Sequence, residues 1–280
     1  MKALNAFQGE EHQPFYWAGG QKAALLVHGF PGTAAELRPL GTALHQAGWT
    51  VHGLLLPGFG PDIVNLGERD PKHWLVAIQT ALLRLRLEHE AVLLIGYSMG
   101  AALALQVAAM QPPSGLVLLA PFRQLGTTWQ NIIGALLSPF FRQVQPFKKA
   151  NFSDPKTREG LTKFFNDLDL DDRAVQQALR ELRLPTRVFK HLNQTGRDGH
   201  RAAPQVTSPS LVIQGSQDEI VTPTTTRRLV EQLPATTRYL ELAAEHDLLN
   251  PERPGWTEIE QAILNFAHQT TSQSVTSHDR

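Results

Sequence analysis

The chain of 280 residues contains no cysteine. This absence excludes disulfide-stapled folds, thiolate metal sites and catalytic cysteine nucleophiles. The 26 basic and 26 acidic side chains give a formal net charge of zero, so the chain has no excess of positive charge with which to bind nucleic acid. Charged residues make up only 19% of the chain and apolar residues 42%, which excludes an intrinsically disordered protein and predicts one large domain or two small ones.

Signals for export and for membrane insertion are also lacking. Residues 1–17 contain no apolar core of a signal peptide, so we expect a cytoplasmic protein. Residues 91–122 contain no charged side chain, but glycine, glutamine and proline interrupt them before about twenty continuous apolar residues accumulate. We therefore interpret this segment as a strand, a helix and a second strand buried at the centre of a sheet.

Short apolar segments alternate with helical patterns in the first part of the chain. The predicted strands span 15–17, 23–27, 49–56, 91–95 and 116–119, and the predicted helices span 32–47, 71–88 and 98–110. Asp70, followed by Pro71, is the expected N-cap of the middle helix. We expect the first two strands to form a hairpin or to lie side by side. The alternation predicts an α/β fold, with a mostly parallel central sheet and helices on both of its faces.

The alternation stops after residue 121 and later resumes. Residues 122–209 show helical patterns but no strand pattern, whereas two further strands and two helices are predicted between 211 and 266. The economical interpretation is an α/β core formed by residues 1–121 and 210–270, with a helical cap inserted at 122–209. We interpret residues 271–280 as a flexible tail.

The segment Gly96-Tyr97-Ser98-Met99-Gly100 lies where a predicted strand turns into a predicted helix. A G-x-S-x-G sequence at such a junction is typical of a nucleophile elbow. The glycines let strand and helix approach closely, and the serine presents its Oγ at the carboxyl edge of the sheet. The alternative is an ordinary helix N-cap serine between two turn glycines. The strand–turn–helix context favours Ser98 as a catalytic nucleophile.

A serine hydroxyl becomes a nucleophile when a base takes its proton, and an acid partner must fix the tautomer of that base. Asp218 and His246 each follow one of the two late strands, so both loops open at the edge of the sheet that carries Ser98. In an α/β fold with a nucleophile elbow, the three residues are also expected in the order Ser, Asp, His along the chain. Glu219 remains an alternative acid. We interpret most other histidines as surface or core residues, and His28 as a residue that shapes its loop.

The oxyanion of a tetrahedral intermediate needs preorganised donors, typically two backbone N–H groups. Met99 supplies one, because it follows the nucleophile at the start of a helix. The second is expected from the loop at 28–32, after the first parallel strand. Pro31 has no N–H, so Phe30 is the predicted donor.

Five segments together resemble the α/β-hydrolase superfamily: HGFPG at 28–32, LLLPGFG at 54–60, GYSMG at 96–100, GSQDEIVTP at 215–223 and EHDLL at 245–249. Within this superfamily, the chain looks most like bacterial carboxylesterases and monoacylglycerol lipases with a helical cap. The resemblance spans roughly residues 15–266. It implies an α/β-hydrolase fold and a triad of Ser98, Asp218 and His246, with the two oxyanion donors named above.

Two positions depart from the family pattern. Phe59 stands where relatives often have histidine, and Glu245 where they often have glycine. The first change removes a polar group near the mouth of the site, so we predict that Phe59 contacts substrate. The predicted cap carries an apolar stripe at helical spacing, formed by Ile132, Ile133, Leu136, Leu137, Phe140 and Phe141. We predict that Ile133, Leu137 and Phe140 line an acyl-chain pocket or make transient contact with a lipid surface; ordinary packing on the core is the alternative.

The sequence therefore predicts a serine hydrolase that cleaves carboxylic esters with a hydrophobic acyl group through an acyl-enzyme. The expected substrates are short- to medium-chain acyl esters or monoacylglycerols. Thioester hydrolysis, acyl transfer on the same triad, and a ligand-binding scaffold with little turnover are the alternatives. The chain contains no nucleotide-binding motif and no metal-spaced cluster, so no cofactor is predicted. The expected partner is a small-molecule ester, not a nucleic acid.

Overall fold

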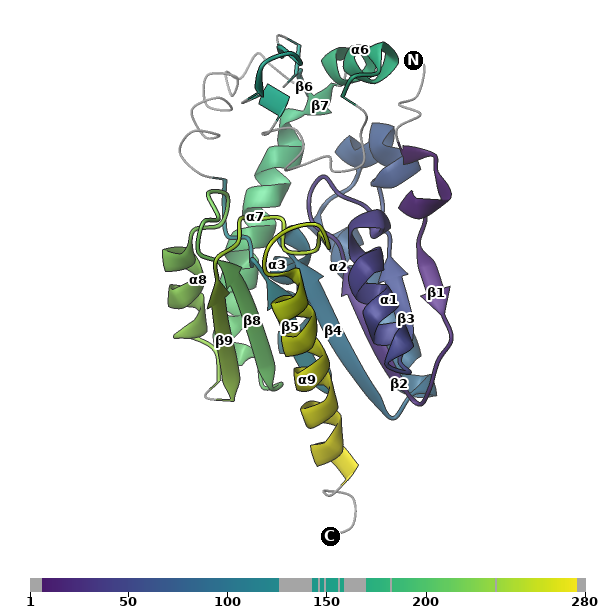
Figure 1. Cartoon of the computed structure of the whole chain (residues 1–280), viewed down its shortest axis with the longest axis vertical. Helices are drawn as coiled ribbons and strands as arrows, with labels where there is room; N and C mark the ends of the chain where they lie inside the picture. Colours follow the sequence, from purple (N-terminus) through teal and green to yellow (C-terminus); the bar gives the residue numbers. More distant parts are fainter. Residues whose placement is uncertain are drawn as a thin grey trace.

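The computed structural model describes residues 7–125, 143–145, 147–148, 150–155, 157–158, 170–181, 183–234 and 236–275. Within these residues the chain forms one central sheet with helices on both faces (Figure 1). The predicted pocket residues Ile133, Leu137 and Phe140, like the rest of the apolar stripe, lie outside the described residues.

The central sheet has seven strands in the order β1-β3-β2-β4-β5-β8-β9. They are β1 (Phe15–Trp17), β2 (Lys22–Val27), β3 (Thr50–Leu54), β4 (Ala91–Tyr97), β5 (Gly115–Leu119), β8 (Ser210–Gly215) and β9 (Thr237–Leu242). β1 pairs with β3 in the antiparallel direction, and every other neighbouring pair is parallel. The structure confirms the predicted mostly parallel sheet.

β1 and β2 are not neighbours, so the prediction of a hairpin or of adjacent strands is wrong. β3 lies between them, with Phe15 paired to Gly53 on one side and Ala24 to Val51 on the other. Pairing at this edge buries the Phe15 side chain in the cluster that also contains residues of the first helix. The guanidinium of Arg38 lies 4.8 Å from the centre of the Phe15 ring. These contacts are distant in sequence, so local spacing did not reveal them.

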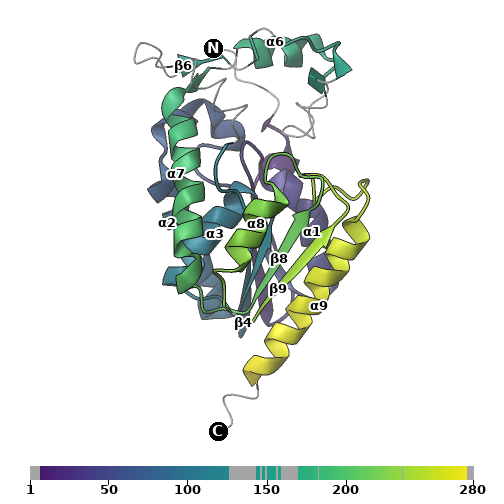
Figure 2. The same ribbon diagram turned by 90° about the vertical axis from the view of Figure 1, so that its left-hand side faces the viewer.

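The helices form two layers. One face of the sheet is covered by α1 (Arg38–Gln46) and α9 (Trp256–Val275). The other face is covered by α2 (Pro71–Glu88), α3 (Met99–Met110), α7 (Thr186–Ala202) and α8 (Pro223–Val230), as the turned view in Figure 2 shows. Alternate residues of β4 face the two layers: Leu94 packs in the cluster with α2 and α3, and Leu93 in the cluster with α1 and α9. Burial on both faces explains why this strand is apolar throughout.

Helix α2 begins and ends where the sequence predicts. The Asp70 carboxylate accepts hydrogen bonds from the N–H groups of Lys72 and His73, at 2.9 and 3.2 Å. A cap of this kind is worth about 1 kcal/mol. Helix α9 continues to Val275, and therefore extends into the range predicted as a tail. Short 3-10 segments connect other elements at Glu10–His12, Ala34–Leu37, Gly60–Glu68 and Ala203–Gln205.

The predicted insertion at 122–209 contains elements of two kinds. Helix α7 lies along α3 in the layer that covers the sheet (Figure 2). Helix α6 (Arg173–Glu181) and the strands β6 (Gln143–Val144) and β7 (Leu184–Pro185) lie beyond the carboxyl edge of the sheet (Figure 1). β6 and β7 pair in the antiparallel direction, so the expectation of no strand in this range is wrong. Two-residue strands are too short to leave a periodic pattern. Among the described residues, no helix combines the length and the apolar character needed to cross a membrane.

Candidate active site

Ser98 lies at the sharp turn between β4 and α3. Its backbone has φ 52° and ψ −114°, a conformation that non-glycine residues rarely adopt. The Ser98 N–H donates to the carbonyl of Leu119 at 2.8 Å, and the Ser98 carbonyl accepts from Phe122 N–H at 3.2 Å. The neighbouring strand and the segment after it thus hold the strained backbone in place, as expected for an elbow.

The glycines on either side of Ser98 are required by close backbone approach. A Cβ at Gly100 would lie 2.2 Å from the carbonyl oxygen of Val27, and a Cβ at Gly96 would lie 2.5 Å from the carbonyl oxygen of Gly100. Neither distance is compatible with a side chain. This geometry confirms the reason given for the two glycines from the sequence.

The structure brings Ser98, His246 and Asp218 together. The Ser98 Oγ lies 3.1 Å from His246 Nε2, and His246 Nδ1 lies 2.7 Å from Asp218 Oδ2. All three side chains are buried. A carboxylate accepts but cannot donate, so Nδ1 carries the proton and Nε2 is left to accept the proton of the serine hydroxyl.

Asp218 is held by a buried network that the sequence analysis missed. Its Oδ1 accepts from the N–H groups of Ile220 and Val221, both at 2.8 Å. Its Oδ2 accepts from Gln214 Nε2 at 3.1 Å, and Gln214 Oε1 in turn accepts from the Thr226 hydroxyl at 2.6 Å. Gln214 places a side-chain amide in the buried strand β8, and a buried amide must form hydrogen bonds. This amide is the feature of the sequence from which the network could have been predicted.

The loops after β8 and β9 meet at Gly215. A Cβ there would lie 2.3 Å from the carbonyl oxygen of Ala244. Gln217 N–H also donates to this carbonyl, at 3.0 Å. The close approach lets the loop with Asp218 lie directly against the loop with His246.

The two predicted oxyanion donors follow the carboxyl ends of the neighbouring strands β2 and β4. Met99 is the first residue of α3, and Phe30 follows β2 in the next loop. Neither N–H has a hydrogen-bond acceptor within the described part of the chain. Gly29 N–H, by contrast, donates to the Glu36 carboxylate at 2.5 Å, which anchors the loop. Among the described residues, the N–H groups of Phe30 and Met99 therefore have no acceptor. Met99 directly follows Ser98, and Gly29, which precedes Phe30, lies against Ser98, since a Cβ there would be 3.2 Å from Ser98 Cβ.

His28 shapes this loop, as interpreted from the sequence. Its Nδ1 donates to the carbonyl of Gly29 at 2.8 Å, and its Nε2 accepts from Leu56 N–H at 3.0 Å. Complete burial lowers the pKa of His28 to about 4, although the hydrogen bond to Gly29 opposes the shift. The ring is neutral near pH 7 with both nitrogens occupied.

Phe59 is only 1% exposed. Its ring lies edge-on to His28 and Phe30, with centroid separations of 4.9 and 6.1 Å. Phe30 is only partly buried and also lies edge-on to Phe189 of α7, at 6.3 Å. Among the described residues, Phe59 therefore packs against the Phe30 ring from the interior and supports it.

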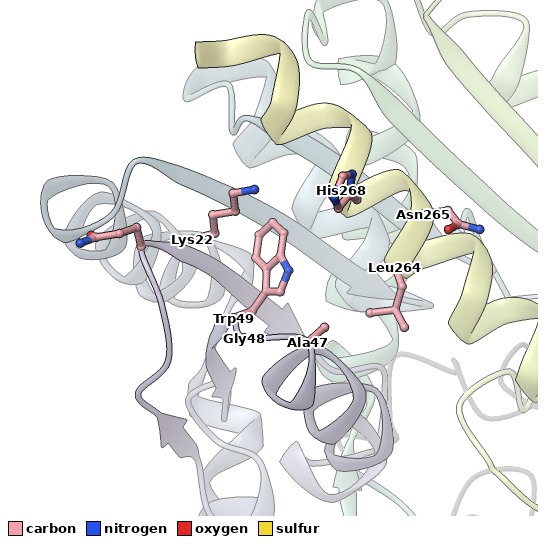
Figure 3. A pocket seen from close by; sticks show the side chains of 8 residues that line it. Lys22, Ala47, Gly48, Trp49, Leu264, Asn265 and His268 are labelled. Carbon is pink, nitrogen blue, oxygen red and sulfur yellow. The ribbon is translucent and has the colours of Figure 1, made fainter.

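A separate hollow of about 480 Å³ lies at the opposite edge of the sheet, where β2 and β3 begin (Figure 3). Lys22 and Trp49 line it from the sheet side, and Leu264 and His268 line it from α9. It is remote from Ser98, which lies at the carboxyl end of β4. Within the described ranges, no group of three or more His, Asp or Glu side chains is placed to hold a metal ion.

The family that matches this chain and two of its relatives carry the names of hydrolases. Residues 20–253 match the family described as "Serine aminopeptidase, S33" (Hydrolase_4). A carboxylesterase from Bacillus subtilis (strain 168) is 25% identical over 213 residues, which cover 75% of this chain and 77% of the relative. A thermostable monoacylglycerol lipase from Bacillus sp. (strain H-257) is 33% identical over 100 residues, 36% of this chain and 40% of the relative.

A solved structure from work on the metagenome-derived lipolytic enzymes LipS and LipT superposes with a TM-score of 0.74. It shares 19% identity and covers 93% of this chain and 98% of its own. This likeness shows the α/β-hydrolase fold. The match over residues 20–253 assigns the chain to the Hydrolase_4 family ("Serine aminopeptidase, S33"), and with its named relatives it is a serine hydrolase of the esterase and lipase type.

Proposed function

We propose that this chain hydrolyses carboxylic esters through an acyl-enzyme on the triad of Ser98, His246 and Asp218. One observation carries the proposal: an unbroken hydrogen-bonded path runs from the Ser98 hydroxyl through the imidazole to the Asp218 carboxylate. This arrangement supplies a nucleophile, a base and an orienting acid in reach of one another.

In the first half-reaction, Ser98 Oγ bonds to the acyl carbon while its proton moves to His246 Nε2. The Asp218 carboxylate stabilises the resulting imidazolium through the Nδ1 proton. The negative oxygen of the tetrahedral intermediate accepts from the N–H groups of Met99 and Phe30. Collapse of the intermediate breaks the ester C–O bond, and the Nε2 proton passes to the leaving alcohol.

In the second half-reaction, a water molecule takes the place of the alcohol. His246 Nε2 accepts a proton from the water as its oxygen attacks the acyl carbon of the acyl-enzyme. The second tetrahedral intermediate expels Ser98 Oγ, which regains a proton from Nε2. The products are a carboxylic acid and the free enzyme.

The proposed substrates are short- to medium-chain acyl esters or monoacylglycerols. The names of two relatives, a carboxylesterase and a monoacylglycerol lipase, support this class. The partly buried Phe30, which packs against the buried Phe189, provides apolar surface in the proposed oxyanion loop. In this proposal, Ile133, Leu137 and Phe140 extend that surface, and Phe59 acts by holding Phe30.

The test is hydrolysis of p-nitrophenyl esters from acetate to palmitate and of 1-monoacylglycerols. Ser98→Ala should lower kcat by about a thousandfold or more, because it removes the nucleophile. Ser216→Ala is the matched control: this exposed serine lies near Asp218 in sequence, and its side chain makes no hydrogen bond within the described residues. Equal rates for wild type and Ser98→Ala would overturn the proposal.

Two further substrates separate the alternatives. An acyl thioester tests the thioesterase alternative, and an aminoacyl anilide tests the peptidase activity named by the family description. Esters should be cleaved with the highest kcat/KM. A higher kcat/KM on either of the other substrates would move the assignment to that class while leaving the triad in place.

A further inference from the structure

A groove of about 280 Å³ is lined by residues of α7 and α8 and by Arg123. Both helices lie in the layer that covers one face of the sheet (Figure 2). Arg197, His200 and Arg201 line it from α7, at the three- and four-residue spacing that places them on one helix face. Arg123 contributes from the segment after β5. The wall on the α8 side is formed by Thr225, Arg228 and Gln232.

The lining is strongly cationic. It contains four arginines and no carboxylate. Arg201 forms an ion pair with Asp198 at 2.8 Å, but Arg123, Arg197 and Arg228 have no ion-pair partner among the described residues. Arg123, Arg197 and Arg228 are exposed, so water and salt screen their mutual repulsion, but three unpaired positive charges around one hollow still favour an anion there.

The back of the groove holds an unsatisfied polar atom. His200 is 8% exposed, and its Nε2 has no hydrogen-bond partner in the described structure. Burial is the main cause that lowers the pKa of His200 to about 4, so the ring is neutral and the arginines carry the charge. The other ring nitrogen donates to the Pro121 carbonyl, so Nε2 is an acceptor. A phosphate oxyanion cannot donate to it, so its partner is water or a hydroxyl of the ligand's organic group.

Both walls of the groove are anchored to the core. The segment that carries Arg123 is tied to α7, because Leu125 N–H donates to Asn193 Oδ1 at 2.8 Å. Helix α8 is tied to the sheet by the hydrogen bond from Thr226 to Gln214. The guanidinium groups therefore extend from fixed backbone positions.

We propose that this groove binds the phosphate group of a small soluble phosphate monoester. Guanidinium groups pair with phosphate in a bidentate manner, and phosphate accepts hydrogen bonds from several directions, whereas a carboxylate accepts them in one plane. Gln232 Nε2 donates to the Arg228 carbonyl at 3.0 Å and has a second N–H, which adds one neutral donor. The Thr225 hydroxyl already shares a hydrogen bond with the Thr222 hydroxyl at 3.0 Å. The volume is near the lower limit of about 300 Å³ for small-molecule sites, so it accommodates a phosphate with a small organic group.

A soluble ligand fits better than a lipid headgroup. The large hydrophobic side chains that are exposed in the described structure are Tyr16, Val64, Val76, Leu83, Leu87 and Met110. None of them belongs to α7 or α8, so the described residues of these two helices present no exposed large apolar side chain that would enter a bilayer.

The proposal is tested by isothermal titration calorimetry with inorganic phosphate and with glycerol 3-phosphate. The variants are Arg228→Gln and Arg197→Gln. Arg227→Gln is the matched control, because it removes the same charge from the adjacent position of α8, where Arg227 pairs with Glu241 at 2.6 Å outside the groove. We expect saturable binding to wild type, a loss of about tenfold in affinity for each groove variant, and less than about twofold for the control.

Three outcomes would overturn the proposal. The first is no saturable binding of either phosphate probe. The second is an equal loss of affinity in Arg227→Gln and Arg228→Gln, which would show that the positive charge of α8 attracts phosphate without a specific site. The third is binding to vesicles of phosphatidylcholine and phosphatidylglycerol, lost in Arg228→Gln, without binding of the soluble probes. Circular dichroism of each variant confirms that it is folded. Because the readout is binding, these outcomes are independent of esterase activity.

Discussion

The phenol of Tyr97 donates a hydrogen bond to the backbone carbonyl of His246, with 2.9 Å between the oxygens. The two rings also lie 5.4 Å apart between centroids, at an angle of 34°. Burial is the main cause that raises the pKa of Tyr97 well above its ordinary value, so the phenol remains a donor. Tyr97 directly precedes Ser98, and it therefore links the serine turn to the histidine loop.

Tyr97→Phe removes this link and keeps the ring. The His246 carbonyl retains a second donor, Leu248 N–H at 2.9 Å, so the expected loss in unfolding free energy is only about 1 kcal/mol. We expect kcat on a p-nitrophenyl ester to fall severalfold with little change in KM. Tyr16→Phe is the control, since Tyr16 is exposed on β1. Unchanged kcat and unchanged stability in Tyr97→Phe would show that the link has no positioning role.

Asp218→Asn tests the orientation of the imidazole. The N–H groups of Ile220 and Val221 hold an oxygen at the Oδ1 position, so the NH2 group of asparagine would face His246 Nδ1 and favour the wrong tautomer of the ring. We expect kcat to fall by about three to four orders of magnitude. Glu219→Gln serves as the control and also tests the alternative acid. A larger effect of Glu219→Gln would transfer the role of the acid to Glu219.

Gln214→Met tests the network behind Asp218. Methionine keeps the length of the side chain but removes the donor to Asp218 Oδ2 and the acceptor for the Thr226 hydroxyl. We expect a loss of about 1–3 kcal/mol in unfolding free energy by urea denaturation, and a lower kcat without a matching rise in KM. Gln217→Met, at an exposed position nearby, should change neither quantity. Wild-type kcat and stability in Gln214→Met would contradict the positioning role.

The stability of the fold should fall as the pH drops from about 6.5 to about 4. Burial lowers the pKa values of His28 and His200 from 6.5 to about 4. In this pH range the unfolded chain binds protons that the folded chain does not bind, so acidification favours unfolding. For His28 alone, the full effect is about 3 kcal/mol.

His28→Gln isolates this contribution. The Gln side-chain oxygen can accept from Leu56 N–H in place of Nε2, but the side chain no longer titrates. The measurement is urea denaturation at about pH 7 and about pH 4.5. The variant should lose less stability between these two conditions than wild type. An equal loss in both proteins would mean that His28 does not titrate with the proposed shift.

The site was easier to predict than its surroundings. Parallel strands end at the same edge of a sheet, so residues after three such strands meet there regardless of the details of packing. This rule predicts, from the sequence alone, that Ser98, Asp218 and His246 lie close together. The residues that hold them, Gln214 and Tyr97, act through contacts between elements far apart in the chain.

Other features had no local signal. The place of β1 beside β3 depends on the packing of Phe15, which local spacing does not reveal. Strands β6 and β7 are too short to show alternation. The arginines of the groove are scattered over three segments, and only the tertiary fold brings Arg197 of α7 and Arg228 of α8 to the same hollow.

The most direct test of the central claim is mass spectrometry of the protein after reaction with a fluorophosphonate. The reagent bonds covalently to an activated serine and stops at a stable analogue of the tetrahedral intermediate. The account predicts a single adduct, mapped to Ser98 by peptide sequencing and absent from Ser98→Ala. An ester-cleaving protein that carries its adduct on another residue, or none on Ser98, would contradict the account.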